Sequence, residues 1–300
     1  MRKILIRFLS VVAAAAIGLV TAACSPLGTT GPMSGPYAKT IWGPDVSNYQ
    51  HPFGAAINWT AVRGQGARFA FVKMSEGDFY VNPYAGSDIQ GALAAGLYVG
   101  VYHFARPRLP LSTATSDANL FASQLGNVRL AGYLPPVLDI ETNGGLSATQ
   151  VTSWTHLFLD ALQADTGRVP MIYSGSWFWR GYMGNPMDFS QYPVWIADYE
   201  PANTGPTLFG DFSYSTFWQY SDTAQVSGIA DAVDSSWFHG SLTQLSQLAY
   251  LPTTAIARAS QARELLSTMS QQPSPGSTKD SIGTTGAMMA QNPATIGATH

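Results

Sequence analysis

Short β-rich runs alternate with helical stretches between about residue 40 and residue 250, and this order limits the possible folds more than any other feature. Apolar and aromatic runs predict strands at Trp42–Ser47, Phe69–Ser75, Tyr98–Phe104, Pro136–Glu141, Met171–Ser174, Val194–Tyr199 and Phe217–Ser221. Helices are predicted between the earlier strands, at Tyr84–Ala95, Ser112–Leu125 and Ser147–Asp165. The alternation favours an α/β fold in which helical crossovers join parallel strands.

The helix ends carry local signals. Gly96 follows the first predicted helix as a C-cap, and Thr166-Gly167 ends the third. Ser147 and Gln150 have the spacing of a capping box at the start of the third helix. After about residue 170 the helices shorten and Gly, Pro and aromatic residues increase, so the second half departs from regular alternation.

Two carboxylates lie close together in the predicted strand Pro136–Glu141. Side chains two residues apart in a strand point the same way, so Asp139 and Glu141 are expected to share a face at its C-terminal end. Neighbouring carboxylates are not both easily ionised, so one pKa is expected to rise, as a general acid for glycoside cleavage requires. The alternative is that the triplet is an ordinary solvated strand end.

Other polar residues occupy the ends of the predicted strands. In β/α barrels, the C-terminal strand ends form the active site. We expect His103 to face the same side as Asp139. Each of these residues alone could simply cap a loop, but carboxylates and aromatics converging at one mouth are typical of glycan cleavage. The residues are Asp45, Ser75, Glu76, His103, Asp139, Glu141, Tyr173, Asp198, Tyr199 and Gln219.

The composition excludes several classes of function. Hydrophobic residues make up 46% of the chain, enough for a sizeable core. The sequence has no H-E-x-x-H motif, no pair of cysteines, no G-x-S-x-G elbow and no Walker loop, so we expect neither a metal nor a cofactor. The net charge of −3 disfavours binding to nucleic acid, because the phosphate backbone is itself negative. We also expect a monomer.

The first residues are typical of an export signal. Arg2, Lys3 and Arg7 precede an apolar run from Phe8 to Val20, which is short for a membrane span. Cys24 is the only cysteine and follows small residues, an arrangement that resembles the bacterial lipoprotein box. We expect lipidation of Cys24 and a location on the outer face of the membrane; the alternative is an ordinary secretory signal.

The composition also divides the chain. We expect a signal peptide at residues 1–23, a lipidated Cys24 with a flexible tether to residue 39, and a catalytic barrel at 40–250. Residues 251–300 are expected to contain one helix at Thr253–Met269 and a disordered tail beyond Gln271.

A series of segments resembles glycoside hydrolase family 25 lysozymes. The run from Gly43 to Gln50 looks like the family's opening G-x-D-V-S-x-x-Q, and Leu138–Glu141 is similar to its acidic D-x-E. Further segments follow in the family's order, so that the likeness covers about residues 42–240. They are Ile57–Trp59, Phe69–Gly77, Gly96–Phe104, Val194–Tyr199, Trp218–Tyr220, and Gly228-Ile229 with Val233-Asp234.

The resemblance implies a modified TIM-type barrel of five β/α units followed by three strands. It also implies hydrolysis of the β-1,4 bond between N-acetylmuramic acid and N-acetylglucosamine in peptidoglycan. Glu141 would be the acid and Asp139 its neighbour, while Asp45 and Asp234 would line the cleft. Substrate contacts are expected from Glu76, His103, Tyr173, Trp195, Tyr199 and Gln219.

Two departures from the family pattern are modest. Met74-Ser75 replaces the more usual Ala-Thr, and Ser235-Ser236 follows Asp234 where Leu-Asn or Leu-Asp is common. All four matched acids are present, which favours an enzyme. Two alternatives are a wall-binding lipoprotein that holds glycan without cutting it and a hydrolase of chitin or another N-acetylhexosamine polymer.

Overall fold

The computed structural model describes residue 39 and residues 41–126, 133–200 and 204–250. The predicted signal peptide, Cys24, nearly all of the predicted tether, the helix Thr253–Met269 and the tail lie outside the described residues. Among the described residues, no helix has the length and apolar character needed to cross a membrane.

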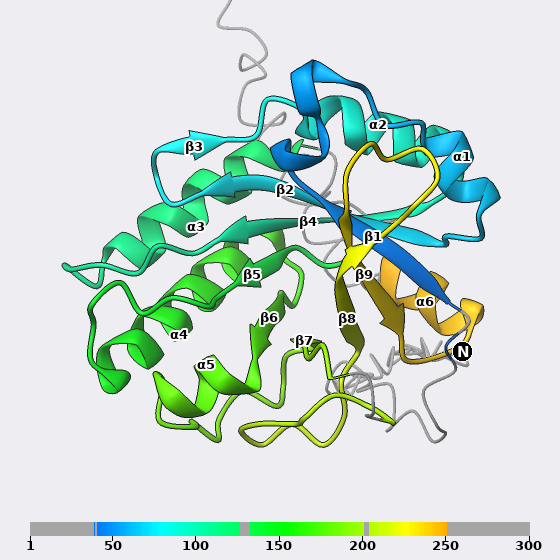
Figure 1. Cartoon of the computed structure of the whole chain (residues 1–300). Helices are drawn as coiled ribbons and strands as arrows, with labels where there is room; N and C mark the ends of the chain where they lie inside the picture. Colours follow the sequence, from blue (N-terminus) through cyan, green and yellow to red (C-terminus); the bar gives the residue numbers. More distant parts are fainter. Residues whose placement is uncertain (1–38, 40, 127–132, 201–203, 251–300) are drawn as a thin grey trace, which may run out of the picture. The chain divides into compact units, whose positions relative to one another are not determined.

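Strands and helices alternate through the first part of the described chain and strands alone follow until a last helix (Figure 1). The strands are β1 (Trp42–Val46), β2 (Phe69–Glu76), β3 (Tyr80–Val81), β4 (Tyr98–Phe104), β5 (Val137–Asp139), β6 (Met171–Gly175), β7 (Val194–Ala197), β8 (Phe217–Ala224) and β9 (Val233–Phe238). The helices are α1 (Trp59–Gly64), α2 (Ala85–Ala94), α3 (Thr113–Gln124), α4 (Ala148–Thr166), α5 (Ser176–Gly181) and α6 (Leu242–Tyr250), with short 3₁₀ turns at Asn48–Gln50 and Pro52–Gly54.

The sheet closes on itself. Its order is β1-β9-β8-β7-β6-β5-β4-β2-β3, and β1 also pairs with β2, so all strands except β3 form a barrel. Neighbouring barrel strands are parallel except at β9, which runs antiparallel to both β8 and β1. Five strand–helix units therefore precede β7, β8 and β9, which confirms the predicted modified barrel.

The predicted strand bounds were wrong by one to three residues at several ends, and two of these ends carry candidate site residues. β5 stops at Asp139 and β7 at Ala197, so Glu141 and Tyr199 lie in the loops beyond their strands. The sequence analysis also missed β3, which is only two residues long and pairs with the end of β2. These differences occur where the chain leaves the sheet, and apolar patterning is least informative at such boundaries.

Helix α4 begins and ends as the sequence predicts. The Ser147 Oγ accepts a hydrogen bond from the Gln150 backbone N–H, and the Gln150 side chain accepts one from the Ser147 N–H at 2.9 Å. Gly167 ends the helix with a φ of 66°, a left-handed conformation that glycine adopts without steric cost. At the end of α2 the C-cap is Ala95, and Gly96 is the left-handed residue after it.

Aromatic side chains fill the inside of the barrel. The Phe71 and Trp195 rings stack with centroids 4.3 Å apart, and the edge of Phe217 lies against Phe71 at 5.1 Å. Two glycines make room for this packing, since a Cβ on Gly43 would lie 2.0 Å from the Phe69 carbonyl oxygen and one on Gly100 would lie 2.4 Å from the Phe71 ring. Burial of each such Phe stabilises the fold by about 1.5–3 kcal/mol.

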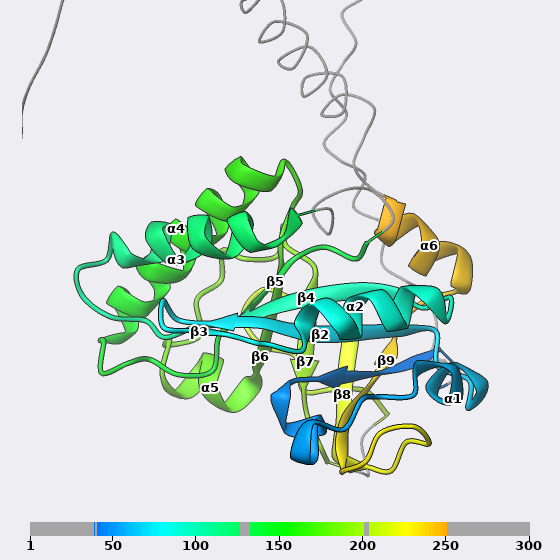
Figure 2. The same ribbon diagram turned by 90° about the horizontal axis from the view of Figure 1, so that it is seen from above.

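A second apolar core lies outside the barrel wall, beneath the helices. Trp154 and Phe158 of α4 and Phe121 of α3 are fully buried in it. Figure 2 shows α2, α3 and α4 alongside β2, β4 and β5, and among the described residues no helix separates β7, β8 and β9. The outer wall is therefore covered by helices along only part of its circumference.

Candidate active site

A cavity of about 350 Å³ opens where the parallel strands end, and we call it the mouth cavity. Its floor includes Trp195 and Tyr173, which also belong to the aromatic filling of the barrel. Five carboxylates and one ammonium group line it, so most of its charge is negative. The charged residues are Asp45, Lys73, Asp139, Glu141, Asp222 and Asp234.

Strand register brings the acids together from distant parts of the sequence. Asp45 of β1 pairs directly with Asp234 of the antiparallel β9. Asp139 pairs with Tyr173 of β6, and Tyr173 pairs with Trp195 of β7. Side chains at paired positions point to the same side of a sheet, so all of these residues point into the barrel.

Gln219 links the polar groups at the base of the cavity. Its Nε2 donates hydrogen bonds to Asp45 Oδ2 at 3.0 Å and to Asp234 Oδ2 at 3.3 Å. Its Oε1 accepts hydrogen bonds from the hydroxyls of Tyr173 at 2.7 Å and Tyr199 at 2.6 Å. Gln219 is only 1% exposed, so these bonds fix both its orientation and the positions of the two carboxylates.

The environment of Asp139 and Glu141 favours their protonated forms. Burial raises the pKa of Asp139 well above its usual value, and the negative charge of Glu141 raises it further. Burial also raises the pKa of Glu141, while Lys73 and Arg106 oppose that rise. The Oδ1 of Asp139 is buried and has no hydrogen-bond partner among the described residues. The pair can therefore hold a proton that an isolated carboxylate would lose.

Asp45 and Asp234 form a second carboxylate pair. Burial raises the pKa of Asp45 well above its usual value, and the charge of Asp234 adds to the rise. Burial likewise raises the pKa of Asp234 to about 6, with repulsion from Asp222 and Glu141 adding to it. Both residues are expected to make the folded state sensitive to pH.

Replacing Asp234 with Asn is expected to stabilise the fold at neutral pH. The folded state holds the Asp234 proton more tightly than the unfolded state does, so protonation of Asp234 stabilises the fold. This stabilisation is complete below about pH 4 and is lost as the pH rises through about 6. Asp234→Asn removes that loss, so its melting temperature should exceed that of wild type at about pH 7 and converge with it near pH 4. Asp231→Asn, on the exposed part of the same hairpin, is the control. Parallel pH dependences of wild type and Asp234→Asn would contradict the assignment.

Lys73 is a charged residue of the mouth cavity that was not predicted from the sequence to be functional. Its Nζ lies 2.6 Å from Glu76 Oε2 and 4.9 Å from the centre of the Phe104 ring. Glu76 also accepts a hydrogen bond from Arg106 Nε at 2.8 Å. Glu76 was expected to contact substrate, but it is not among the residues that line the mouth cavity, and its carboxylate is engaged by Lys73 and Arg106. In the sequence, the spacing Lys73-x-x-Glu76 is the signal that could have indicated this ion pair.

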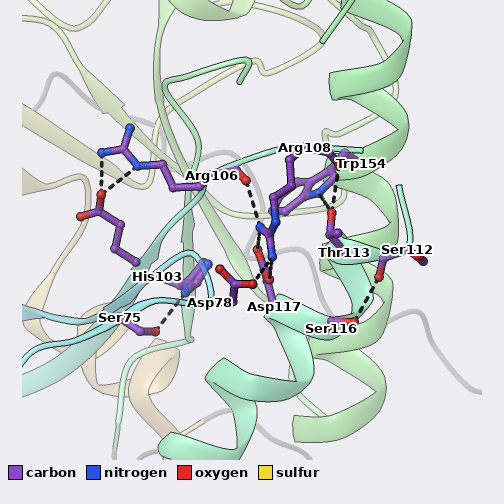
Figure 3. A network of polar contacts seen from close by, with 11 residues as sticks. Ser75, Asp78, His103, Arg106, Arg108, Ser112, Thr113, Ser116, Asp117 and Trp154 are labelled. Carbon is purple, nitrogen blue, oxygen red and sulfur yellow. Dashed lines mark hydrogen bonds and ion pairs between the residues drawn. The ribbon is translucent and has the colours of Figure 1, made fainter. Parts of the chain in front are cut away.

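Ion pairs hold the loop after β4 at the rim of the barrel (Figure 3). Arg108 binds both carboxylate oxygens of the buried Asp117 on α3, at 2.8 and 2.9 Å, and also pairs with Asp78 at 2.8 Å. Thr113 Oγ1 donates to the Arg108 carbonyl at 3.0 Å and accepts from Trp154 Nε1 at 3.1 Å. The loop that carries Arg106 is thus attached to α3, α4 and the β2–β3 turn.

The expectation that His103 faces the same side as Asp139 was wrong. His103 pairs with Leu138, whereas Phe104 pairs with Asp139, so His103 points outward from the barrel. It is fully buried, and its ring stacks on Phe158 with centroids 5.2 Å apart. Its Nδ1 lies 3.0 Å from Ser75 Oγ (Figure 3), and burial lowers its pKa to about 3. His103 is therefore a neutral residue of the outer core.

The other expected site residues are near the acids. Tyr173, Trp195 and Gln219 line the mouth cavity, and Tyr199 reaches it through its bond to Gln219. Asp198 instead accepts a hydrogen bond from the Thr207 backbone N–H at 2.7 Å, in the loop beyond β7. Several lining residues were not predicted from the sequence; they lie on β4, in the turn after β1 and at the β8–β9 hairpin: Tyr49, Tyr102, Phe104 and Asp222.

The cavity suits proton transfer and the binding of uncharged polar groups. Within the described part of the chain, no group of three His, Cys, Asp or Glu residues is arranged to hold a metal ion. The paired carboxylates supply a proton donor and an acceptor, and the tyrosines and Trp195 supply flat apolar surface with hydroxyl and N–H groups. This combination matches the chemistry of glycoside hydrolysis.

Comparisons with known proteins show which family the chain resembles. The chain is 36% identical over 217 residues to Lysozyme M1 of Streptomyces globisporus, covering 70% of this chain and 71% of that protein. It is 33% identical over 220 residues to the N,O-diacetylmuramidase of Chalaropsis sp, covering 70% and 99%. Among solved structures, the bacterial lysozyme from Streptomyces coelicolor matches with a TM-score of 0.65 and 35% identity, over 71% of this chain and 98% of that one. Residues 44–229 match the family described as Glycosyl hydrolases family 25, and with the barrel and its acid-lined mouth this shows that the chain belongs to that family.

Proposed function

We propose that the chain is a muramidase that cleaves the β-1,4 bond after N-acetylmuramic acid in peptidoglycan, with Glu141 as the general acid and Asp139 assisting. The observation that carries the proposal is the placement of this carboxylate pair at the mouth of a family 25 barrel. Relatives named as lysozymes and N,O-diacetylmuramidases support the substrate class.

The pKa directions fit an acid role for Glu141. Burial raises its pKa, so it keeps a proton at a pH where an exposed glutamate is ionised. In the proposed reaction this proton goes to the oxygen that links the two sugars, and the bond from that oxygen to the anomeric carbon breaks. A water molecule later adds to the anomeric carbon, and its proton returns to Glu141.

Asp139 is proposed to act through the substrate. The muramic acid unit carries an N-acetyl group whose carbonyl oxygen can attack the anomeric carbon and form a cyclic intermediate. With the pair's proton on Glu141, the Asp139 carboxylate, which lines the mouth cavity, would accept a hydrogen bond from the amide N–H and stabilise the positive charge that develops there. Attack by water from the opposite side then opens the ring.

This mechanism is expected to retain the anomeric configuration, because two inversions occur at the same carbon. Proton NMR of the first product, recorded before mutarotation, should show the β anomer. Mass spectrometry of the enzyme during turnover should show no covalently bound sugar. A first product with the α configuration would contradict the participation of the N-acetyl group.

The activity is tested by measuring reducing ends released from purified peptidoglycan and from chitin. A muramidase should act on peptidoglycan and release much less from chitin, which lacks muramic acid. Preferential cleavage of chitin would favour a general N-acetylhexosaminidase, and binding to both polymers without any released reducing ends would favour a glycan-binding protein.

The N-terminal sequence supports a proposal about location. We propose that residues 1–23 direct export and that Cys24 carries the lipid that anchors the protein at the outer face of a bacterial membrane. One acyl chain holds a protein at a membrane only marginally, so stable anchoring requires at least two chains.

Cys24→Ser is expected to release the protein from the membrane fraction. The hydroxyl cannot form the thioether to the lipid, so the variant should accumulate as a precursor or as a differently cleaved product. Cell fractionation and intact-mass measurement would check this. A wild-type protein found only in the medium, without an acyl mass on Cys24, would contradict anchoring and leave the muramidase proposal unaffected.

A further inference from the structure

A second pocket, of about 270 Å³, lies on the outside of the barrel, and we call it the outer pocket. Its lining residues come from β1, β8 and β9, from the turn after α1 and from the loop that joins β8 to β9. Figure 1 shows β1, β8 and β9 side by side. The residues that give it its chemistry are Trp42, Gln65, Tyr220, Gln225, Ser235 and Trp237. None of its lining residues is shared with the mouth cavity.

Strand β9 separates the two cavities. Asp234 lines the mouth cavity and Ser236 accepts a hydrogen bond from Trp195 Nε1 inside the barrel at 3.0 Å. Successive residues of a strand point to opposite faces, so Ser235 and Trp237 point outward and line the outer pocket. No helix of the described chain lies between β7 and β8 or between β8 and β9 in sequence.

Aromatic rings build one side of the outer pocket. The Tyr220 and Trp237 rings are parallel within 8° and their centroids are 3.6 Å apart. The Trp218 ring packs edge to face against the Trp237 ring with centroids 5.2 Å apart, and this contact holds the stacked Tyr220–Trp237 pair in place. Trp42 lies opposite Trp237 in the β1–β9 register. The pocket therefore offers a rigid, flat apolar surface.

Polar groups complete the pocket. Gln65 Oε1 accepts a hydrogen bond from the Ser227 backbone N–H at 2.7 Å, which leaves the side-chain NH₂ to donate elsewhere. Gln225 is exposed, and its amide can donate and accept. None of the described residues that line the outer pocket is acidic. The Lys39 ammonium group lies 4.9 Å from the centre of the Trp237 ring. The outer pocket thus differs in charge from the acid-lined mouth cavity.

We propose that the outer pocket binds a pyranose unit of a peptidoglycan glycan strand while the mouth cavity cleaves the same strand or a neighbouring one. The apolar faces of a sugar ring fit against aromatic rings, and its hydroxyl and acetamido groups fit the two glutamine amides. The lactyl and peptide carboxylates of peptidoglycan would be attracted by the Lys39 ammonium group and would meet no repelling carboxylate in the described lining of the outer pocket. This inference rests on the proposed muramidase function for the identity of the glycan.

A second glycan contact would increase the time that the enzyme stays on an insoluble wall. Two sites on one rigid barrel convert the second binding event into an intramolecular one, so weak binding in the outer pocket raises overall avidity. A glycan too short to reach from one site to the other would occupy only one of them. The outer pocket should therefore affect activity on walls and leave cleavage of short fragments unchanged.

The test measures binding of the full chain to insoluble peptidoglycan stripped of protein and of attached wall polymers. Glu141→Gln is the parent, so that the polymer stays intact, and Trp237→Ala and Gln225→Ala are added to it separately. Loss of a ring contact of about 0.5–1.5 kcal/mol corresponds to a roughly two- to tenfold weaker binding for Trp237→Ala. Gln225→Ala, at an exposed position, should weaken binding in the same direction. Tyr214→Ala, a partly exposed aromatic that precedes β8, should bind as the parent does.

The same substitutions in the active chain separate the two proposals. Trp237→Ala and Gln225→Ala should slow the release of reducing ends from walls while cleaving short soluble muropeptide glycans at the wild-type rate, which also shows that they are folded. Unchanged wall binding by both variants would overturn the outer-pocket proposal, as would weaker binding seen only on walls that retain their attached polymers. Absence of cleavage of any glycan by wild type would instead overturn the proposed function, and the binding comparison would still report on the pocket.

Discussion

Glu141→Gln is expected to lower the rate of peptidoglycan cleavage by a factor of roughly a hundred to ten thousand, the range that general-acid catalysis contributes. The amide keeps the shape of the side chain but carries no acidic proton for the departing sugar. Because Glu141 is held in the cavity at a cost in solvation, which is the reason for its raised pKa, the variant should fold as well as wild type. Reducing-end release from purified peptidoglycan and thermal unfolding measure the two effects.

The matched control is Glu200→Gln, which changes an exposed glutamate in the loop after β7. It should retain wild-type activity. If Glu141→Gln kept most of its wall-cleaving activity, another group would have to donate the proton. If it lost activity together with its melting transition, the loss would report on folding, and the acid role would then rest on the pH profile of wild type.

Asp139→Asn is expected to lower kcat by about a hundredfold or more, because the positive charge that develops on the substrate amide would lose its counter-charge. Removing one of two repelling carboxylates also lowers the pKa of the other. Activity requires a proton on the Asp139–Glu141 pair, and the repulsion between their charges raises the pH at which the pair loses that proton. The descending limb of the pH profile should therefore move to lower pH in Asp139→Asn.

Rates measured as a function of substrate concentration and pH test this expectation. Asp231→Asn removes an exposed carboxylate and should leave both kcat and the pH profile unchanged. A larger effect of Asp139→Asn on KM than on kcat would assign Asp139 to ground-state binding and would contradict its proposed part in the reaction.

Much of the barrel could be predicted from sequence because its strands are continuous apolar runs. Runs such as Phe69–Val72 are buried on both faces, inside by the aromatic filling and outside by helices, and this produces the pattern. The capping box of α4 is a local signal and was equally readable. Strand β3 was missed because two residues held by pairing with β2 carry no periodicity.

The site was less predictable, because it depends on the side to which each strand-end residue points. His103 and Phe104 are neighbours at the end of β4, and only the register with β5 decides that Phe104 lines the cavity while His103 is buried outside. In the sequence, Lys73 interrupts an apolar strand, and only the structure shows that its charge is neutralised by an ion pair with Glu76. The role of Gln219 in joining Asp45 to Asp234 requires the closed barrel, since these residues meet only where β9 joins β1.

The central claim is that the Asp139–Glu141 pair cleaves the bond on the reducing side of N-acetylmuramic acid. The most direct measurement is to digest purified peptidoglycan with wild type and with Glu141→Gln, reduce the new ends with borodeuteride, and identify the labelled sugar by mass spectrometry. Wild type should place the label on muramitol, and Glu141→Gln should produce little label. Label on glucosaminitol, or equal labelling by the two proteins, would contradict the claim.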